Sequence, residues 1–186
     1  MIDEDILEAA AAWAGEYVAP LGRRWQHVRA VASKAAHVAT TFSSNDAGVL
    51  VAAAWLHDIG YAGDLALSGF HPLDGGRFVR ARGVEDRVAL LVANHSGARV
   101  EAELRGIEGY AAEFPFIDDA LDAALTYCDL TTGPDGLEMS LHRRVAEISD
   151  RYGRDHVTAR AVTACVWEFE RMVAETEARI ACAGSR

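Results

Sequence analysis

Imidazole and carboxylate side chains stand at the ends of apolar segments in this sequence. His57 and Asp58 directly follow the run Ala-Ala-Ala-Trp-Leu, and Asp129 follows a second apolar run, Ala-Leu-Thr-Tyr-Cys. A charged aspartate at the end of an apolar helix is costly unless it is paired or bound to a cation. The pattern therefore predicts that both carboxylates are neutralised where they lie.

Further histidines fall where helix ends can converge. His27 lies within a predicted helix beside its apolar stripe, His71 precedes Pro72 at the start of a helix, and His95 ends another. Imidazole and carboxylate together are the ligand set of a divalent transition metal, namely iron, manganese, zinc, nickel or cobalt. For two of these histidines there is a simpler alternative to metal binding. His71 could lie next to a helix N-cap, and His95 could interact with the dipole at a helix C-terminus.

The elements that must position these side chains are predicted to be helices. Apolar residues recur at intervals of three and four, and no alternating run of strand length occurs. We therefore expect an all-α fold with a single domain over residues 1–186, in which helices of 137–183 pack on a metal-binding core of about 22–136. Trp25, Trp55 and Trp167 are expected in the core. The expected helices span residues 2–17, 21–42, 47–58, 72–83, 85–95, 118–129, 140–152 and 155–183.

The order of these residues resembles that of a known family. His27, then His57-Asp58, then Asp129 resembles the H…HD…D signature of the HD-domain superfamily of metal-dependent phosphohydrolases, and His57-Asp58-Ile59-Gly60 looks like its HDIG form. The resemblance spans residue 22 to about residue 136. It implies a single helical HD-domain bundle in which His27, His57, Asp58 and Asp129 hold a metal ion.

Two more histidines extend the resemblance. The placing of His71 and His95 is similar to that in two-metal members, which implies that both bind a second ion together with a bridging Asp58. The segments around them also look like those of the branch that hydrolyses diadenosine tetraphosphate symmetrically. Many two-metal members carry a lysine three residues after the motif aspartate, where this chain has Tyr61, and Lys34 is its only lysine. A mechanism that needs that lysine is therefore disfavoured.

The implied activity is hydrolysis of a phosphoester or phosphoanhydride bond in a small molecule, with a nucleotide as the favoured substrate, by a metal-activated water. One or two ions would be bound, and Asp58 would be catalytic by bridging them and orienting the nucleophile. Two alternatives remain: a di-iron oxygenase of the same fold, and a non-enzymatic nucleotide-binding regulator. The candidate substrate-binding residues are Tyr61, Arg77, Arg80 and Arg99, although a solvated surface position is the alternative for each arginine.

Composition excludes several other classes. The 186 residues include 18 basic and 28 acidic side chains, a net charge of −10, which argues against a nucleic-acid surface or a polybasic membrane patch. No apolar run reaches the ~18 to 20 residues of a membrane span, and the acidic start is unlike a secretory signal, so a cytoplasmic protein is expected. The three cysteines lack CxxC spacing and indicate neither a disulfide framework nor a zinc ribbon. The C-terminal helices could also form the interface of a homodimer, an alternative that the sequence does not decide.

Overall fold

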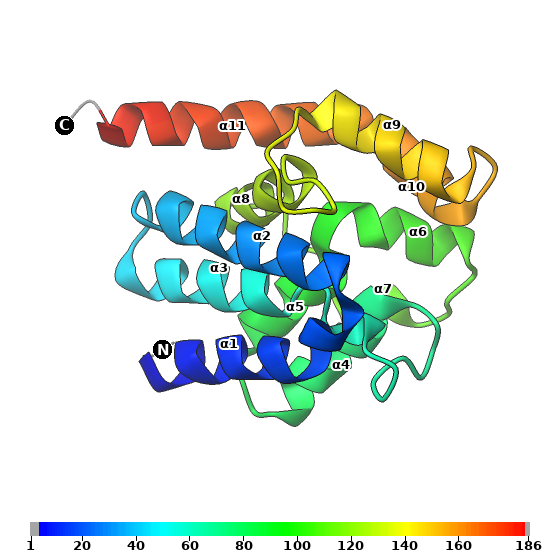
Figure 1. Ribbon diagram of the computed structural model, residues 1–186, viewed down its shortest axis with the longest axis horizontal. Coiled ribbons are helices and arrows are strands. Elements are labelled where there is room, and N and C mark those ends of the chain that lie inside the picture. The colour runs from blue at the N-terminus through cyan, green and yellow to red at the C-terminus, as the bar shows by residue number, and fades with distance from the viewer. Residues whose placement is uncertain (1–3, 185–186) are drawn as a thin grey trace.

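The chain is a stack of helices (Figure 1). The computed structural model describes residues 4–184, and within that range it holds no β-strand, so the all-α prediction is confirmed. Short 3₁₀ turns are η1 (Ala19–Leu21), η2 (Ile59–Tyr61) and η3 (His95–Gly97). The α-helices are α1 (Glu4–Val18), α2 (Arg23–Ala39), α3 (Ser44–Leu56), α4 (His71–Ala81), α5 (Asp86–Asn94), α6 (Ala98–Leu104), α7 (Tyr110–Glu113), α8 (Ala120–Leu130), α9 (Leu141–Tyr152), α10 (Val157–Ala164) and α11 (Val166–Gly184).

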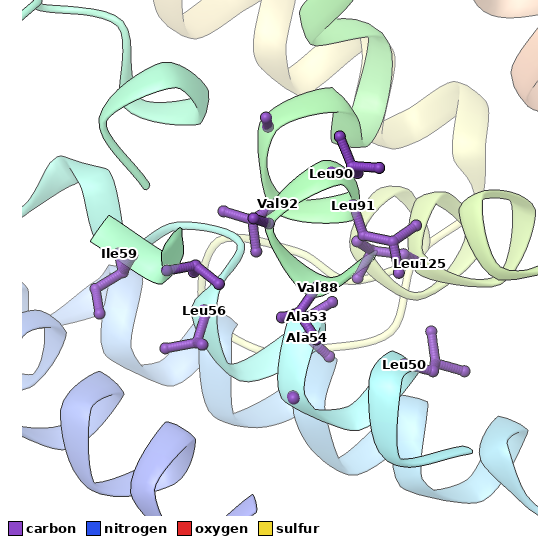
Figure 2. Packing of buried hydrophobic residues seen from close by; sticks show 14 of the residues in the cluster. Leu50, Ala53, Ala54, Leu56, Ile59, Val88, Leu90, Leu91, Val92 and Leu125 are labelled. Carbon is purple, nitrogen blue, oxygen red and sulfur yellow. The ribbon is translucent and has the colours of Figure 1, made fainter. Parts of the chain in front are cut away.

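Helix α3 is the centre of the packing. It contacts α1, α2, α5 and α8, which explains why its sequence is apolar almost all round. Ser43 caps its first turn, since the Ser43 hydroxyl accepts a hydrogen bond from the Asp46 amide. Figure 2 shows Leu50 and Leu56 of α3, Val88 and Leu91 of α5 and Leu125 of α8 gathered in this core. Burying each such side chain contributes about 1.5–3 kcal/mol, so the end of α3 is held firmly.

Helix α8 connects the core to the C-terminal helices. It packs on α2 and α3 and also on α11, which runs along the outer edge of the molecule (Figure 1). A smaller apolar cluster forms there, including Leu130 from α8, Ile148 from α9 and Phe169 from α11. The C-terminal helices thereby come to lie beside the end of α8, where Asp129 is found.

Two of the expectations from the sequence need correction. The single helix expected over 155–183 is two helices, because Cys165 leaves helical geometry at φ −94° and ψ 2°. Cys165 packs against Gly97 there: a Cβ on Gly97 would meet the Cys165 Sγ at 3.2 Å. Trp167 is 70% exposed and is no core residue, whereas Trp25 and Trp55 pack partly buried against the core.

Within residues 4–184, no helix is both long enough and apolar enough to cross a lipid bilayer.

Candidate metal centre

The HDIG segment turns sharply at the end of α3. His57 ends the helix, Asp58 precedes η2, and Gly60 lies directly against the start of α4. A Cβ on Gly60 would meet the His71 carbonyl oxygen at 2.1 Å and the Gly75 amide nitrogen at 2.7 Å. Only glycine allows this approach, and the approach brings His71 to Asp58.

His27, His57 and Asp129 form the first of two clusters. They come from α2, the end of α3 and α8, and all three are at most 6% exposed. The His27 Nε2 lies 3.0 Å from Asp129 Oδ1 and 3.4 Å from the His57 Nε2. The three ligand-type atoms of this group all lie within 4.8 Å of one another, a spacing that could hold one ion.

Backbone carbonyls orient the imidazoles. The His57 Nδ1 lies 2.8 Å from the Ala54 oxygen, the His95 Nδ1 lies 2.7 Å from the Val92 oxygen, and the His27 Nδ1 lies 3.0 Å from the Gly133 oxygen. A carbonyl only accepts, so each Nδ1 carries the proton and donates it. Each Nε2 of a neutral ring is then left with a free lone pair, the arrangement found in metal-ligating histidines.

Asp58, His71 and His95 form the second cluster. The Nε2 atoms of His71 and His95 are 3.3 Å apart, and the His71 Nε2 lies 3.4 Å from Asp58 Oδ1. The other carboxylate oxygen of Asp58, Oδ2, faces the first cluster at 3.6 Å from the His57 Nε2 and 4.0 Å from the His27 Nε2. Asp58 thus offers one oxygen to each cluster.

Burial favours the neutral form of His57 and His71, whereas Asp58 and Asp129 stay charged. Burial lowers the pKa of His57 to about 4 and that of His71 well below 6.5, despite the nearby carboxylates. Burial alone would raise the pKa of Asp58, but Arg24 and His57 hold it well below its usual range. His27 and His57 beside Asp129 likewise hold the pKa of Asp129 below its usual range, against the effect of burial.

This arrangement fits a metal ion. In each cluster two Nε2 atoms approach within hydrogen-bonding distance, yet neutral rings protonated at Nδ1 have no proton to place between His27 and His57. Facing lone pairs repel, and a cation between them relieves the repulsion. The donor set of imidazoles and carboxylates suits a divalent transition metal.

Ser96 is a site residue that the sequence analysis missed. It has φ +49°, the left-handed region that non-glycine residues rarely adopt, and its hydroxyl donates a short hydrogen bond to Asp129 Oδ2. Strained backbone of this kind is often retained where it positions a side chain for function. The Ser-Gly pair after His95 predicts the end of a helix, and only the fold shows that it also aims a hydroxyl at Asp129.

The second cluster opens into a cavity with an empty volume of about 540 Å³. Tyr61, one of the expected substrate-binding residues, lines it and stacks on His71 with ring centres 3.8 Å apart. Arg24 lies over the other side of the Tyr61 ring at 3.5 Å and contacts Asp58 Oδ2 at 2.5 Å. Arg144 and Arg151 of α9 also line the cavity.

The three arginines expected to bind substrate lie elsewhere. None of them lines this cavity, because each is engaged on another face of the molecule. Arg77 pairs with Glu113 at 2.7 Å, Arg80 with Asp86 at 2.6 Å, and Arg99 with Glu168 at 3.3 Å. They were predicted because they lie near His71 or His95 in the sequence. Their side chains, however, point from α4 and α6 away from the cavity.

The single lysine has a structural position. The Lys34 ammonium group donates to the Thr131 carbonyl oxygen at 3.0 Å and to the Thr131 hydroxyl at 2.8 Å. It therefore satisfies acceptors at the end of α8, next to Asp129 and to the loop whose Gly133 carbonyl orients His27. The position three residues after Asp58 is thus Tyr61 and not a lysine, whereas Lys34 stabilises the end of α8 next to Asp129.

Comparison with known proteins points the same way as the geometry. The family model described as HD domain matches residues 24–155, well over half of the chain and all six residues of the two clusters. Searches of curated proteins and of solved structures found no significant match.

Proposed function

Because the chain belongs to the HD-domain superfamily, whose members are mostly metal-dependent hydrolases, we propose that it hydrolyses a phosphoester or phosphoanhydride bond of a small molecule, with a nucleotide as the favoured substrate. The observation that carries the proposal is Asp58, whose two oxygens face two separate histidine clusters at 3.4 Å and 3.6 Å. Such a pair of sites around a shared carboxylate is suited to phosphoryl chemistry.

The residues would divide between two ions. His27, His57 and Asp129 would hold the first, His71 and His95 would hold the second, and Asp58 would contact both. A bound divalent ion would supply Lewis acidity toward phosphoryl oxygens and would lower the pKa of water from about 16 toward ~7.

The side chains of the chain itself would orient the reactants. Asp58, charged because its pKa is held low, accepts hydrogen bonds and would orient the attacking water. Arg24 would bind a phosphoryl oxygen and offset the negative charge that develops during transfer. The Tyr61 ring holds both Arg24 and His71 by stacking, so it would keep them at the phosphoryl group.

Arginine around the cavity favours phosphate as the ligand. Arg24, Arg144 and Arg151 all line the space next to Asp58, and arginine is the residue best suited to phosphate oxygens. Oxygen uptake with iron(II) that is coupled to product formation would favour the oxygenase, and tight nucleotide binding without turnover would favour the regulator.

The direct test is a hydrolysis screen. Protein loaded with Mn²⁺, Fe²⁺, Co²⁺, Ni²⁺ or Zn²⁺ is incubated with nucleoside mono-, di- and triphosphates, dinucleotide polyphosphates, cyclic nucleotides and bis(p-nitrophenyl) phosphate. We expect turnover of at least one class, which Asp58→Asn reduces by about 10³-fold or more. Asp64→Asn removes an exposed carboxylate from the following loop and is the matched control. Absence of turnover with every metal and substrate would contradict the proposal.

A further inference from the structure

A second hollow adjoins the metal centre and is lined by arginine. It has an empty volume of about 530 Å³, and its wall includes Arg23, Arg24, Arg144 and Arg151, with His27 also reaching it. No aspartate or glutamate is among its lining residues. The chain as a whole has a net charge of −10, so this group of arginines is a local positive region. Such a region favours the binding of an anion.

The hollow and the cavity of the metal centre share a wall. Arg24, Arg144 and Arg151 line both spaces. Their guanidinium groups are broad planar donors that can bond two oxygens at once. An anion in the hollow would therefore contact arginine side chains that also border a phosphoryl group held at Asp58.

Arg144 is the strongest single indication of a ligand. It is only 6% exposed, and its Nε is buried without a hydrogen-bond partner among residues 4–184. Its Nη1 pairs with Glu147 at 2.6 Å, and its Nη2 lies 4.0 Å from Asp129 Oδ1. A buried guanidinium donor without an acceptor is unfavourable by about 1–3 kcal/mol or more, and an anionic oxygen at the wall that Arg144 lines would satisfy it.

The carboxylates near these arginines only partly balance them. Glu147 pairs with Arg144 and, at 3.3 Å, with Arg151, and Asp58 pairs with Arg24. Arg23 is exposed and forms no ion pair within the part of the chain that the structure describes. The hollow therefore keeps positive charge that no side chain on its surface neutralises.

We infer that the substrate carries a second phosphate linked to the scissile one, and that Arg23, Arg144 and Arg151 hold this second phosphate in the hollow. The inference rests on the proposed function and narrows its substrate class to phosphoanhydrides, that is, to diphosphate or longer chains. In the net reaction, water oxygen bonds to the scissile phosphorus and the bridging P–O bond breaks. The second phosphate leaves with the electron pair, and the proton of the water is released to it or to solvent.

Binding to the metal-free protein tests the inference without activity. Titration calorimetry at low salt would compare inorganic phosphate, pyrophosphate and tripolyphosphate. We expect pyrophosphate to bind at least ~10-fold more tightly than phosphate, and Arg23→Gln and Arg151→Gln each to weaken pyrophosphate ~3- to 10-fold. Arg143→Gln removes an exposed arginine from the same helix, α9, and should leave the affinity unchanged.

Arg144 needs a gentler change because it is buried. Arg144→Lys keeps the charge and removes the Nε donor, and we expect it to weaken pyrophosphate more than phosphate. If that variant does not fold, the two exposed arginines still decide the matter. Equal affinity for phosphate and pyrophosphate, or losses in Arg143→Gln as large as those in Arg23→Gln and Arg151→Gln, would overturn the inference.

The hydrolysis screen separates this inference from the proposed function. Turnover of phosphomonoesters with no preference for anhydrides would overturn the second phosphate while leaving the phosphohydrolase intact. Selective pyrophosphate binding that the arginine variants abolish, without turnover under any metal, would support the anion site and contradict the hydrolase.

Discussion

The Nε2 atoms of His27 and His57 face each other at 3.4 Å, while the Nδ1 of each ring is bonded to a backbone carbonyl. Both Nε2 atoms therefore present lone pairs to the same point. Nothing in hydrophobic packing requires two buried acceptors to meet in this way, and a cation at that point would turn a repulsion into two bonds. The relationship supports the metal centre independently of the order of residues in the sequence.

Metal content should follow the histidines of each cluster. We expect elemental analysis to find two ions per chain, falling to about one in His95→Ala and losing the first-site ion in His57→Ala. The exposed His142 provides the control His142→Ala.

Removing metal should also lower the melting temperature. An ion at about 100 times its Kd stabilises the folded state by ~2.7 kcal/mol, which raises the melting temperature by roughly 5–11 °C at this chain size. Calorimetry before and after dialysis against a chelator measures the shift. Equal melting temperatures in both states would argue against tight binding.

Gly60 should be intolerant of a side chain. Gly60→Ala places a methyl group 2.1 Å from the His71 carbonyl oxygen, so η2 and the start of α4 must separate. We expect a loss of about 1–3 kcal/mol in urea unfolding, together with weaker binding at the cluster that contains Asp58 and His71. Gly63→Ala is the matched control, since nothing lies within 4 Å of its added Cβ; a similar loss there would point to a general effect of alanine.

Ser96 should tune metal affinity through Asp129. Ser96→Ala removes the hydroxyl that bonds Asp129 Oδ2, and loss of such a supporting bond typically weakens metal binding about 10- to 100-fold. Ser96→Gly removes the same hydroxyl but relieves the positive φ, so it should be more stable than Ser96→Ala by ~1 kcal/mol. Metal titration and thermal unfolding of the two variants separate these effects; unchanged affinity in both would exclude a role for the hydroxyl.

Asp122 should make stability depend on pH. Burial, with Asp119 nearby, raises the pKa of Asp122 to about 8, and its Oδ2 has no hydrogen-bond partner. The folded state therefore keeps a proton on Asp122 that the unfolded chain releases above pH ~4. The contribution of this protonation to the free energy of unfolding is fully present below pH ~4 and is lost as the pH rises to 8. The neutral amide of Asp122→Asn does not titrate. The free energy of unfolding of this variant minus that of wild type should therefore increase by up to ~1.4 kcal/mol per pH unit across that window. Urea unfolding at pH 5, 6, 7 and 8 measures the slope, and a difference that does not change with pH would contradict it.

The sequence determined the helical class and the residues that converge. Apolar periodicity without alternation predicts an all-α chain, which is confirmed, because the side-chain period is a local property of the backbone. The costly positions of Asp58 and Asp129 at apolar helix ends predicted that both carboxylates are neutralised, and the family resemblance implied that they share a site with His27 and His57. The fold brings these residues close together.

Only the tertiary structure decided what surrounds that site. Arg24 and Arg144 reach the metal centre, whereas Arg77, Arg80 and Arg99 do not, since helix packing sets which way a long side chain points. The break at Cys165 likewise lies where Cys165 packs against Gly97, a residue distant in sequence. The direction of a long side chain and a helix break of this kind are set by contacts between residues far apart in the sequence. Such contacts produce no periodic pattern in the local sequence.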